Sequence, residues 1–218
     1  MNSRDAILAR IRNALAHDAP RTQSPVPEVW PRQNPSPEQM AERFAQELAA
    51  VHGETVRAGS PEEARAKLVE LLDQGAWGPL GAVDRPLCRE LCAGLAPERV
   101  AWVGPESTPQ QIADLPAGLV AADYLLADTG SAMLACGVPH ERLMCYLPPV
   151  CVVAARIDQL YEHLPAVWPQ VAQRAADPAT RGEFVLVTGP SRTADIEKIL
   201  ILGVHGPKRL FILLIDSP

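Results

Sequence analysis

Residues 184–216 read FVLVTGPSRTADIEKILILGVHGPKRLFILLID and contain two apolar, β-forming runs with a polar loop after the first. The first run is FVLV, residues 184–187, and the second is RLFILLID, residues 209–216. Between them, apolar residues recur at helical spacing, which predicts a helix that follows the loop and ends near Leu202. The residues with this spacing are Ile196, Ile199, Leu200 and Gly203. Near-continuous apolar strands are typical of strands buried on both faces, so both runs are predicted to be central strands of a parallel sheet.

The chain before this unit also alternates between helix and strand signals. Ser36-Pro-Glu-Gln and Ser60-Pro-Glu-Glu are capping boxes with proline at the first helical position, and they predict helices over 37–51 and 61–74. Further strands are expected in 53–59, 99–104, 122–128 and 150–156, and further helices over 86–95, 108–115 and 158–168. This alternation predicts an α/β fold with a mostly parallel open sheet and helices on both of its faces.

The N-terminal region looks like an appendage to this sheet. Residues 3–16 place Ile7, Leu8, Ile11 and Leu15 on one face of a helix. Six prolines follow between residues 20 and 37, and proline favours an extended linker or a strap over the domain surface. We therefore divide the chain into an N-terminal helix and proline-rich strap, residues 1–35, and an α/β domain, residues 36–218.

The composition narrows the class of protein. The 218 residues are 47% hydrophobic and 21% charged, with a net charge of -6, which is typical of a soluble globular chain. An acidic balance disfavours nucleic-acid binding, and no apolar run reaches the roughly 18 residues of a membrane span. The charged N-terminus lacks the apolar centre of a secretory signal, so we expect a cytoplasmic protein whose five cysteines are reduced and mostly buried.

The loop after FVLV is the first candidate site. A loop that leaves the carboxyl end of a parallel strand and enters a helix is where open α/β sheets bind ligands, and the helix N-terminus favours an anion. The candidate ligand-binding residues are Thr188, Gly189, Ser191, Arg192, Thr193 and Asp195. Arg192 offers a planar fork for a carboxylate or phosphate, the hydroxyls can donate, and glycine permits close approach. A second interpretation stays open, in which Ser191 or Thr193 only caps the helix and Asp195 only favours its dipole.

Two further groups complete the predicted pocket. Asp128, Thr129, Gly130 and Ser131 follow the apolar run LLA and could point into the same crevice, although the residues alone favour a turn that uses glycine for its backbone freedom. His205 lies just after Gly203, where it is either part of the site or a structural histidine at the helix end.

Several common motifs are missing from the sequence. It contains no G-x-G-x-x-G, no G-x-x-x-x-G-K-[ST], no G-x-S-x-G and no C-x-x-C, and its histidines lack metal-ligand spacing. We therefore expect no metal and no redox centre in this chain, and we assign no catalytic residue. We also assign no site to GVPHERLMCYLPPVCVV, residues 137–153.

Two stretches resemble a known family. TGPSRTADIE followed by LGVHGPKRLFILLID resembles the C-terminal signature of the lactate-utilisation protein C family, which has a LUD domain, and ADYLLADTGS resembles its upstream motif. The resemblance covers essentially the whole chain, more weakly before residue 118. It implies a fold related to the sugar-phosphate isomerase and CoA-transferase group. Its motif positions here are Asp128–Ser131, Thr188–Glu197, Gly203 and His205–Pro207, without chemical roles for the individual residues.

The resemblance also implies a function. The chain would work beside two iron–sulfur subunits that oxidise L-lactate to pyruvate, with the clusters in the partners, and a small carboxylate or phosphate would bind at loops 128–131 and 188–197. Two alternatives stay open: a self-sufficient transferase or ligase for a CoA ester, sugar phosphate or folate, and a non-catalytic assembly module. Whether the chain alone is an enzyme is therefore left undecided.

Overall fold

The computed structural model of the protein describes residues 3–16, 30, 32–177, 182–194, 200–202 and 205–217. Contacts divide the chain into two units, Met1–Pro31 and Arg32–Pro218. This division falls four residues before the boundary expected from the sequence.

In the first unit, the described structure is mainly the helix α1 (Ser3–Ala16), as predicted. Its apolar residues Ile7, Ile11 and Leu15 are 54%, 49% and 63% exposed. Most of the proline-rich strap, residues 17–29 and 31, lies outside the described residues.

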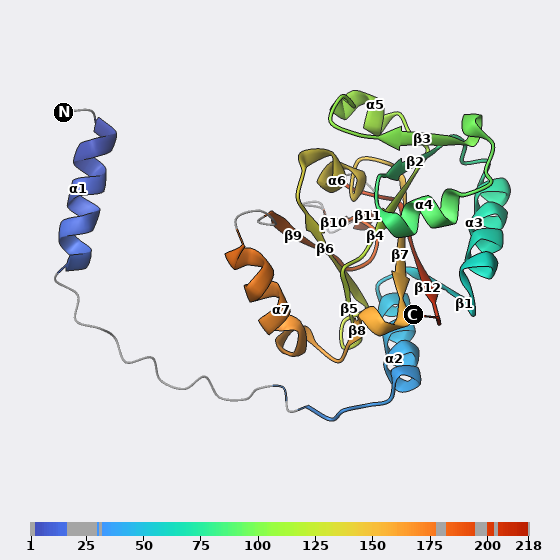
Figure 1. The fold of residues 1–218 in the computed structure, drawn as a ribbon, viewed down its shortest axis with the longest axis horizontal. Helices are drawn as coiled ribbons and strands as arrows, with labels where there is room; N and C mark the ends of the chain where they lie inside the picture. The colour runs from blue at the N-terminus through green and yellow to red at the C-terminus, as the bar shows by residue number, and fades with distance from the viewer. Residues whose placement is uncertain are drawn as a thin grey trace. The chain divides into compact units, whose positions relative to one another are not determined.

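The second unit is built on a six-stranded sheet whose strand pairs are all parallel. The strand order is β1 (Glu54–Ala58), β12 (Arg209–Ile215), β7 (Val150–Arg156), β4 (Ala117–Ala121), β2 (Leu80–Val83) and β3 (Val100–Val103) (Figure 1). β12 lies between β1 and β7, and its residues 210–215 are all buried. The prediction that RLFILLID is a central parallel strand is therefore confirmed.

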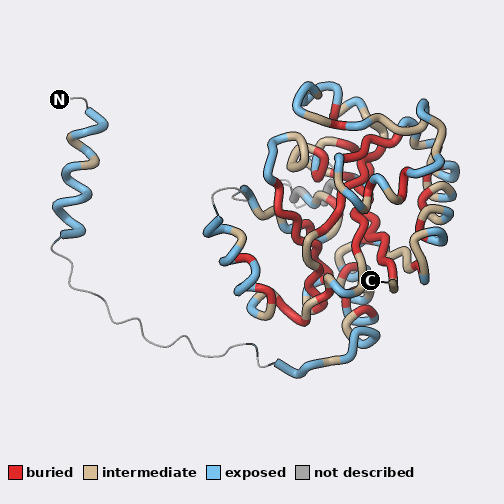
Figure 2. Tube along the Cα trace, viewed as in Figure 1, coloured by how far each residue is buried: buried red, intermediate tan, exposed pale blue. Residues whose placement is uncertain are grey.

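Helices cover both faces of this sheet. α3 (Pro61–Gly75) packs on β1 and β12 and contacts α4 (Pro86–Cys92), which packs on β4 and β7. On the other face, α6 (Pro139–Met144) packs on β2 and β4 and contacts α5 (Pro109–Ala113). The four inner strands β12, β7, β4 and β2 are almost wholly buried, whereas the edge strands β1 and β3 are partly exposed and the helices bury only their inner sides (Figure 2). The predicted fold class is thus confirmed.

A second sheet lies beside the first and has the order β8 (Leu160–Tyr161), β5 (Tyr124–Leu126), β6 (Ser131–Cys136) and β9 (Glu183–Val187). α2 (Pro37–Ala50) contacts both β1 and β8, and α7 (Leu164–Ala176) covers part of this sheet. β9 contains the FVLV run, and among the described strands it pairs with β6 alone, in antiparallel register. The prediction that FVLV is a central parallel strand is wrong, because β9 is an edge strand in which Leu186 is 47% exposed.

The predicted helix after the quoted loop is also wrong for the described residues. β10 (Arg192–Ala194) pairs antiparallel with β11 (Leu200–Leu202), while residues 195–199 and 203–204 lie outside the description. The run at 199–202 is ILIL, and β-branched isoleucine suits a strand as well as a helix, so spacing alone did not decide between them.

For a related reason, the sequence analysis did not predict two strands that are rich in small residues. β2 and β4 read LGAV and AGLVA, and each contains only one β-branched residue and no aromatic residue, which is too few to mark a strand in a sequence. The helix expected over 158–168 begins later, at Leu164, because a 3-10 turn (Ile157–Gln159) and β8 come first.

Within the residues that the structure describes, no helix has both the length and the apolar character needed to cross a bilayer.

Candidate functional site

Hydroxyl groups from the two predicted loops meet. Ser131 begins β6 and Thr188 follows β9, and these strands pair next to both residues. Ser131 Oγ lies 2.6 Å from Thr188 Oγ1 and donates to Thr129 Oγ1 at 2.8 Å. Since the Ser131 proton is used on Thr129, Thr188 donates to Ser131. The structure therefore brings together two motifs that lie 57 residues apart.

The glycines of both motifs lie against the C-terminal end of α2. Gly130 has φ 61° and Gly189 has φ 85°, values that side-chain-bearing residues rarely adopt. A Cβ on Gly130 would lie 2.3 Å from the backbone nitrogen of Leu48, and one on Gly189 would lie 2.8 Å from the carbonyl oxygen of Val51. The close approach that we expected at Gly189 is thus made to the protein's own helix, and Gly130 makes a similar approach.

Asp128 lies at the turn between β5 and β6, beside a polar cavity. Its amide donates to the carbonyl oxygen of Glu162 at 3.1 Å, and its buried Oδ1 has no hydrogen-bond partner among the described residues. The cavity has a volume of about 360 Å³ and is lined by Gln33, Asn34, Pro35, Gln39, Met40, Arg43, Ala127 and Glu162. The Glu162 carboxylate accepts the Gln33 amide with both oxygens, at 3.0 and 3.1 Å, and so holds the segment before α2 in place. No local sequence signal marks this cavity, because its walls come from three distant segments.

The rest of the second loop lies near the start of β12. The Ser191 amide donates to the carbonyl oxygen of Pro207 at 2.8 Å, and a Cβ on Gly206 would lie 3.0 Å from Ser191 Cβ. Arg192 and His205 are exposed. Thr193 lies in β10 opposite Ile201, and Asp195 lies outside the described residues.

Two structural grounds for the predicted anion pocket therefore do not hold. The loop follows an edge strand of the second sheet and lies at the amino end of β12, not at the carboxyl ends of the parallel strands. It leads into β10, so the described residues provide no helix N-terminus at this point. The pocket itself stays a prediction, which now depends on Arg192 and the hydroxyl cluster.

Charged residues that the sequence analysis did not single out lie at the carboxyl ends of the parallel strands. After β2 the chain continues into α4 on one face of the sheet, and after β4 it continues into the second sheet on the other side. The position between β2 and β4 is therefore the topological switch point, which is where open sheets bind ligands. Arg85 follows β2 and Asp123 follows β4, and the Arg85 guanidinium lies 3.2 Å from the Asp123 carboxylate.

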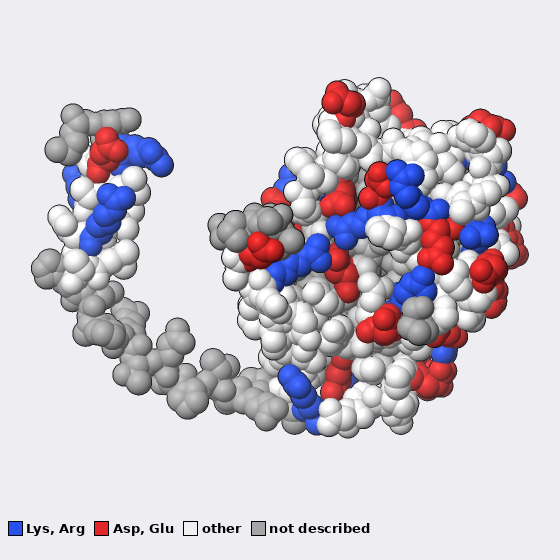
Figure 3. Space-filling view, in the orientation of Figure 1, with Lys and Arg blue, Asp and Glu red and all other residues white. Residues whose placement is uncertain are grey.

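The side chains at this switch point pair with one another. Arg85 Nε donates to Glu141 at 2.8 Å, and Arg174 donates to Asp123 at 2.7 Å. Asp123 also accepts the Ala135 amide at 2.7 Å. Figure 3 shows the result, with basic and acidic side chains intermixed over the face between α4 and α7.

These contacts shift two pKa values. The hydrogen bond to Glu141 raises the pKa of Arg85, although burial opposes it. Burial pushes the pKa of Glu141 up, but the hydrogen bond and charge of Arg85 outweigh it, so the net pKa is lowered. Both charges are therefore held in place. A sequence signal could have found these residues: charged side chains come directly after runs of small apolar residues, at Val83-Asp84-Arg85 and at Ala122-Asp123.

Among the described residues, no group of three or more His, Cys, Asp or Glu is arranged to hold a metal ion.

Comparisons with known proteins agree with the fold. The structure of a DUF162-family protein from Deinococcus radiodurans matches with a TM-score of 0.62 at 16% identity, over 84% of this chain and 99% of that one. Lactate utilization protein C of Bacillus pumilus is 27% identical over 242 residues, covering 100% of this chain and 98% of the relative. Lactate utilization protein C of Halalkalibacterium halodurans is 30% identical over 101 residues, which cover 46% of this chain and 44% of the relative. The family model of the LUD domain matches residues 41–215, so the chain belongs to the LUD domain family.

Proposed function

We propose that this chain takes part in lactate utilisation, as a subunit of a system that oxidises L-lactate to pyruvate. The observation that carries the proposal is the match to lactate utilization protein C of Bacillus pumilus along the full length of both chains. The LUD domain match over residues 41–215 supports it independently.

In this proposal, two partner subunits hold the iron–sulfur clusters that accept electrons from lactate, and this chain contributes no cofactor of its own. The assignment of the clusters to the partners rests on the family resemblance of TGPSRTADIE and ADYLLADTGS. Turnover of lactate by the isolated chain would contradict it.

The proposed role of the two motif loops is to bind a small carboxylate or phosphate. The meeting of Ser131 with Thr188 supports a shared site, and the exposed Arg192 lies four residues after Thr188. A guanidinium pairs with a carboxylate through two parallel hydrogen bonds, and nearby hydroxyls and amides can complete the shell of donors. Asp128 lies in the first loop, and His205 precedes Gly206, which lies against Ser191 of the second loop, so both remain part of the proposed site.

Deletion of the gene in its own host tests the assigned pathway. We expect the deletion strain to lose growth on L-lactate as sole carbon source and to keep normal growth on pyruvate, because pyruvate enters after the proposed step. A plasmid copy should restore growth on lactate. Equal growth of deletion and parent strains on both carbon sources would refute a role in lactate oxidation.

Arg192→Ala in the plasmid copy tests the pocket separately. Loss of a charged hydrogen-bond pair costs about 1.5–3 kcal/mol, so we expect lactate oxidation in extracts to fall by roughly ten- to hundredfold at unchanged protein level. Arg99→Ala is the matched control, since Arg99 forms a surface ion pair with Asp73 and lies far from the loops in sequence. If both variants oxidise lactate normally, the loops are not the anion site, while the deletion phenotype would still support the pathway.

A non-catalytic assembly role is the second candidate, and α1 favours it. None of its described residues is buried, and its apolar residues Ile7, Ile11 and Leu15 remain about half exposed. An apolar helix face of this kind is typical of a segment that docks on a partner. Removal of residues 1–31 should then abolish co-purification of the partner subunits, whereas a purely substrate-binding chain would retain them.

A further inference from the structure

Two thiols meet at the end of β6. Cys136 is the last residue of β6, and Cys145 directly follows α6, so the segment 137–144 folds back and brings the two side chains into a hydrogen bond. Cys136 is 5% exposed and Cys145 is 3% exposed. The Cys145 thiol donates to the carbonyl oxygen of Glu141 at 3.4 Å, which fixes its position at the end of the helix.

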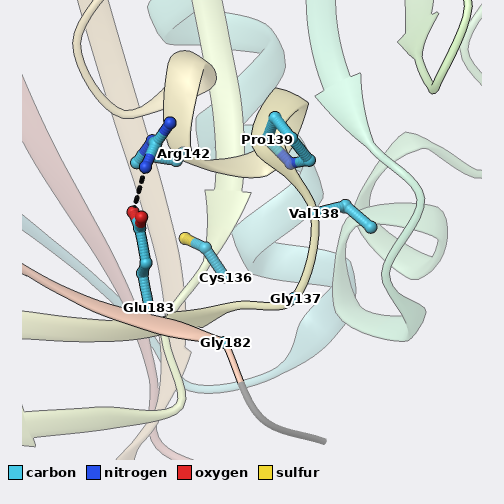
Figure 4. A pocket seen from close by; sticks show the side chains of 7 residues that line it. All are labelled: Cys136, Gly137, Val138, Pro139, Arg142, Gly182 and Glu183. Carbon is cyan, nitrogen blue, oxygen red and sulfur yellow. Dashed lines mark hydrogen bonds and ion pairs between the residues drawn. The ribbon is translucent and has the colours of Figure 1, made fainter. Parts of the chain in front are cut away.

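A cavity opens beside Cys136 but is not lined by Cys145. Its volume is about 190 Å³, and its walls are Cys136, Gly137, Val138, Pro139, Arg142, Gly182 and Glu183. In Figure 4 the Cys136 sulfur points into the space between the Arg142–Glu183 ion pair and the Val138–Pro139 segment. A small molecule that enters this cavity therefore meets one sulfur of the pair first.

The surroundings shift the pKa values of the two thiols in opposite directions. The hydrogen bond with Cys145 lowers the pKa of Cys136, although burial opposes this, and the charge of Arg85 assists it against the nearby carboxylates of Glu141 and Asp123. The same hydrogen bond, followed by burial, raises the pKa of Cys145. Cys136 lines the cavity and Cys145 does not, so Cys136 is the thiol that an entering oxidant meets, and its lowered pKa favours the thiolate, which is the reactive form of cysteine.

The other cysteines lack these features. Burial raises the pKa of Cys88 to about 12, of Cys92 to about 11 and of Cys151 to about 12. None of them lines the cavity beside Val138 and Pro139. The three thiols are expected to react slowly and serve as internal references.

We propose that Cys136 and Cys145 are a redox-active thiol pair, which hydrogen peroxide entering the Cys136 cavity converts to a reversible disulfide. The pairing of an attacking thiol at a cavity with a buried neighbouring thiol is the arrangement that resolves a sulfenic acid within one chain. This site lies in the segment 137–153, to which the sequence analysis assigned no role.

The reaction balances with one peroxide per thiol pair. The Cys136 thiolate attacks one peroxide oxygen, the O–O bond breaks, and the second oxygen leaves as hydroxide and becomes water by taking a proton. The Cys145 sulfur then attacks the Cys136 sulfenic acid, the S–O bond breaks, and a second water leaves with the Cys145 proton. Two thiols lose two electrons and two protons in total, and the peroxide is reduced to two waters. An added dithiol reverses the change by thiol–disulfide exchange.

Mass spectrometry of the purified full-length chain tests the proposal. The chain is treated with hydrogen peroxide, free thiols are blocked with N-ethylmaleimide, and the protein is digested with trypsin. Cleavage after Arg99, Arg142 and Arg156 places Cys136 in the peptide 100–142 and Cys145 in the peptide 143–156. We expect these two peptides to become linked with loss of two hydrogen atoms, and dithiothreitol to separate them.

Single substitutions test which cysteines form the disulfide and whether it forms through a sulfenic acid. Cys151 shares the peptide 143–156 with Cys145, so Cys151→Ser should keep the link and Cys145→Ser should abolish it. In Cys145→Ser, Cys136 should stop at the sulfenic acid and form an adduct with dimedone. Cys136→Ser should prevent both products. Circular dichroism spectra of all three variants check that the fold is intact.

The proposal fails on either of two results. One pKa unit changes the thiolate fraction about tenfold, so N-ethylmaleimide should label Cys136 in the untreated chain at least about ten times faster than Cys88. The first contradicting result is a smaller difference between these two labelling rates. The second is a peroxide-treated chain that contains only over-oxidised cysteine or a link to Cys88, Cys92 or Cys151.

Discussion

Gly130 shows how one residue couples the two motif loops to the rest of the domain. Its positive φ and its contact with the backbone of α2 allow Ser131 to reach Thr188. The sequence identified Gly130 as a motif position, but a glycine in a turn needs only backbone freedom, and the helix that it touches is more than 80 residues earlier. The sequence could therefore predict that a glycine matters at position 130, but it could not predict the contact of Gly130 with α2.

Gly130→Ala should destabilise the domain by at least about 2 kcal/mol, because a left-handed backbone strains alanine by roughly 1–2 kcal/mol and the new Cβ would also overlap α2. Urea unfolding followed by tryptophan fluorescence measures the change. Gly104→Ala is the control, since a Cβ there meets nothing within 4 Å, and it should shift stability by only about 0.5 kcal/mol. Equal effects of the two substitutions would show that the Gly130 contact is not formed.

Glu141 gives a prediction about pH. Its pKa is lowered in the folded state relative to the ordinary 4.5, so its ion pair with Arg85 stabilises the fold above 4.5 and loses that effect as the pH falls through the folded pKa. Glu141→Gln removes the contribution at every pH. We expect the wild-type chain to be more stable than the variant at neutral pH, and this difference to shrink steadily below pH 4.5. A pH-independent difference in urea midpoints would refute the assigned ion pair.

At the scale of elements, apolar runs located strands but did not assign them to sheets. FVLV and RLFILLID look alike in the sequence, yet in the described part of the chain β12 has a partner strand on each side and β9 has one partner strand, β6. Local pattern reports that a residue can be buried, while strand pairing depends on segments that are distant in sequence. The same reason explains why ILIL at 199–202, expected at the end of a helix, contributes to β11.

Matched leucine substitutions test this difference between the two strands. Leu213 in β12 is fully buried and Leu186 in β9 is 47% exposed. Leu213→Ala should cost about 2–5 kcal/mol in unfolding free energy, because it removes buried methyl groups and leaves a cavity. Leu186→Ala should cost less than about 1 kcal/mol. A large cost at Leu186 would mean that β9 is more buried than the structure places it.

At the scale of the molecule, both clusters of buried apolar residues lie within Arg32–Pro218. The glycine contacts with α2, the Ser131–Thr188 pair, the Arg85 network and the thiol pair all belong to this unit as well. The first unit contributes no described buried residue, since α1 has none. The stability of the domain is therefore expected not to depend on the first unit.

Removal of residues 1–31 tests this expectation. We expect the urea midpoint of the shortened chain to agree with that of the full chain to within about 0.5 kcal/mol in free energy, because the truncation keeps Gln33 and its bonds to Glu162. A shortened chain that fails to fold would place part of the core in the first unit.

The sequence by itself determined the α/β class, the capped helices α2 and α3, the buried strand β12 and the family resemblance, because capping boxes, apolar runs and motifs are local. Only the tertiary structure decided that the two motif loops meet through Ser131 and Thr188, that FVLV lies at an edge, that Arg85 and Asp123 fill the switch point and that Cys136 faces a cavity. Each of these depends on which distant segments pack together, and that choice minimises the free energy of the whole chain rather than of any stretch within it.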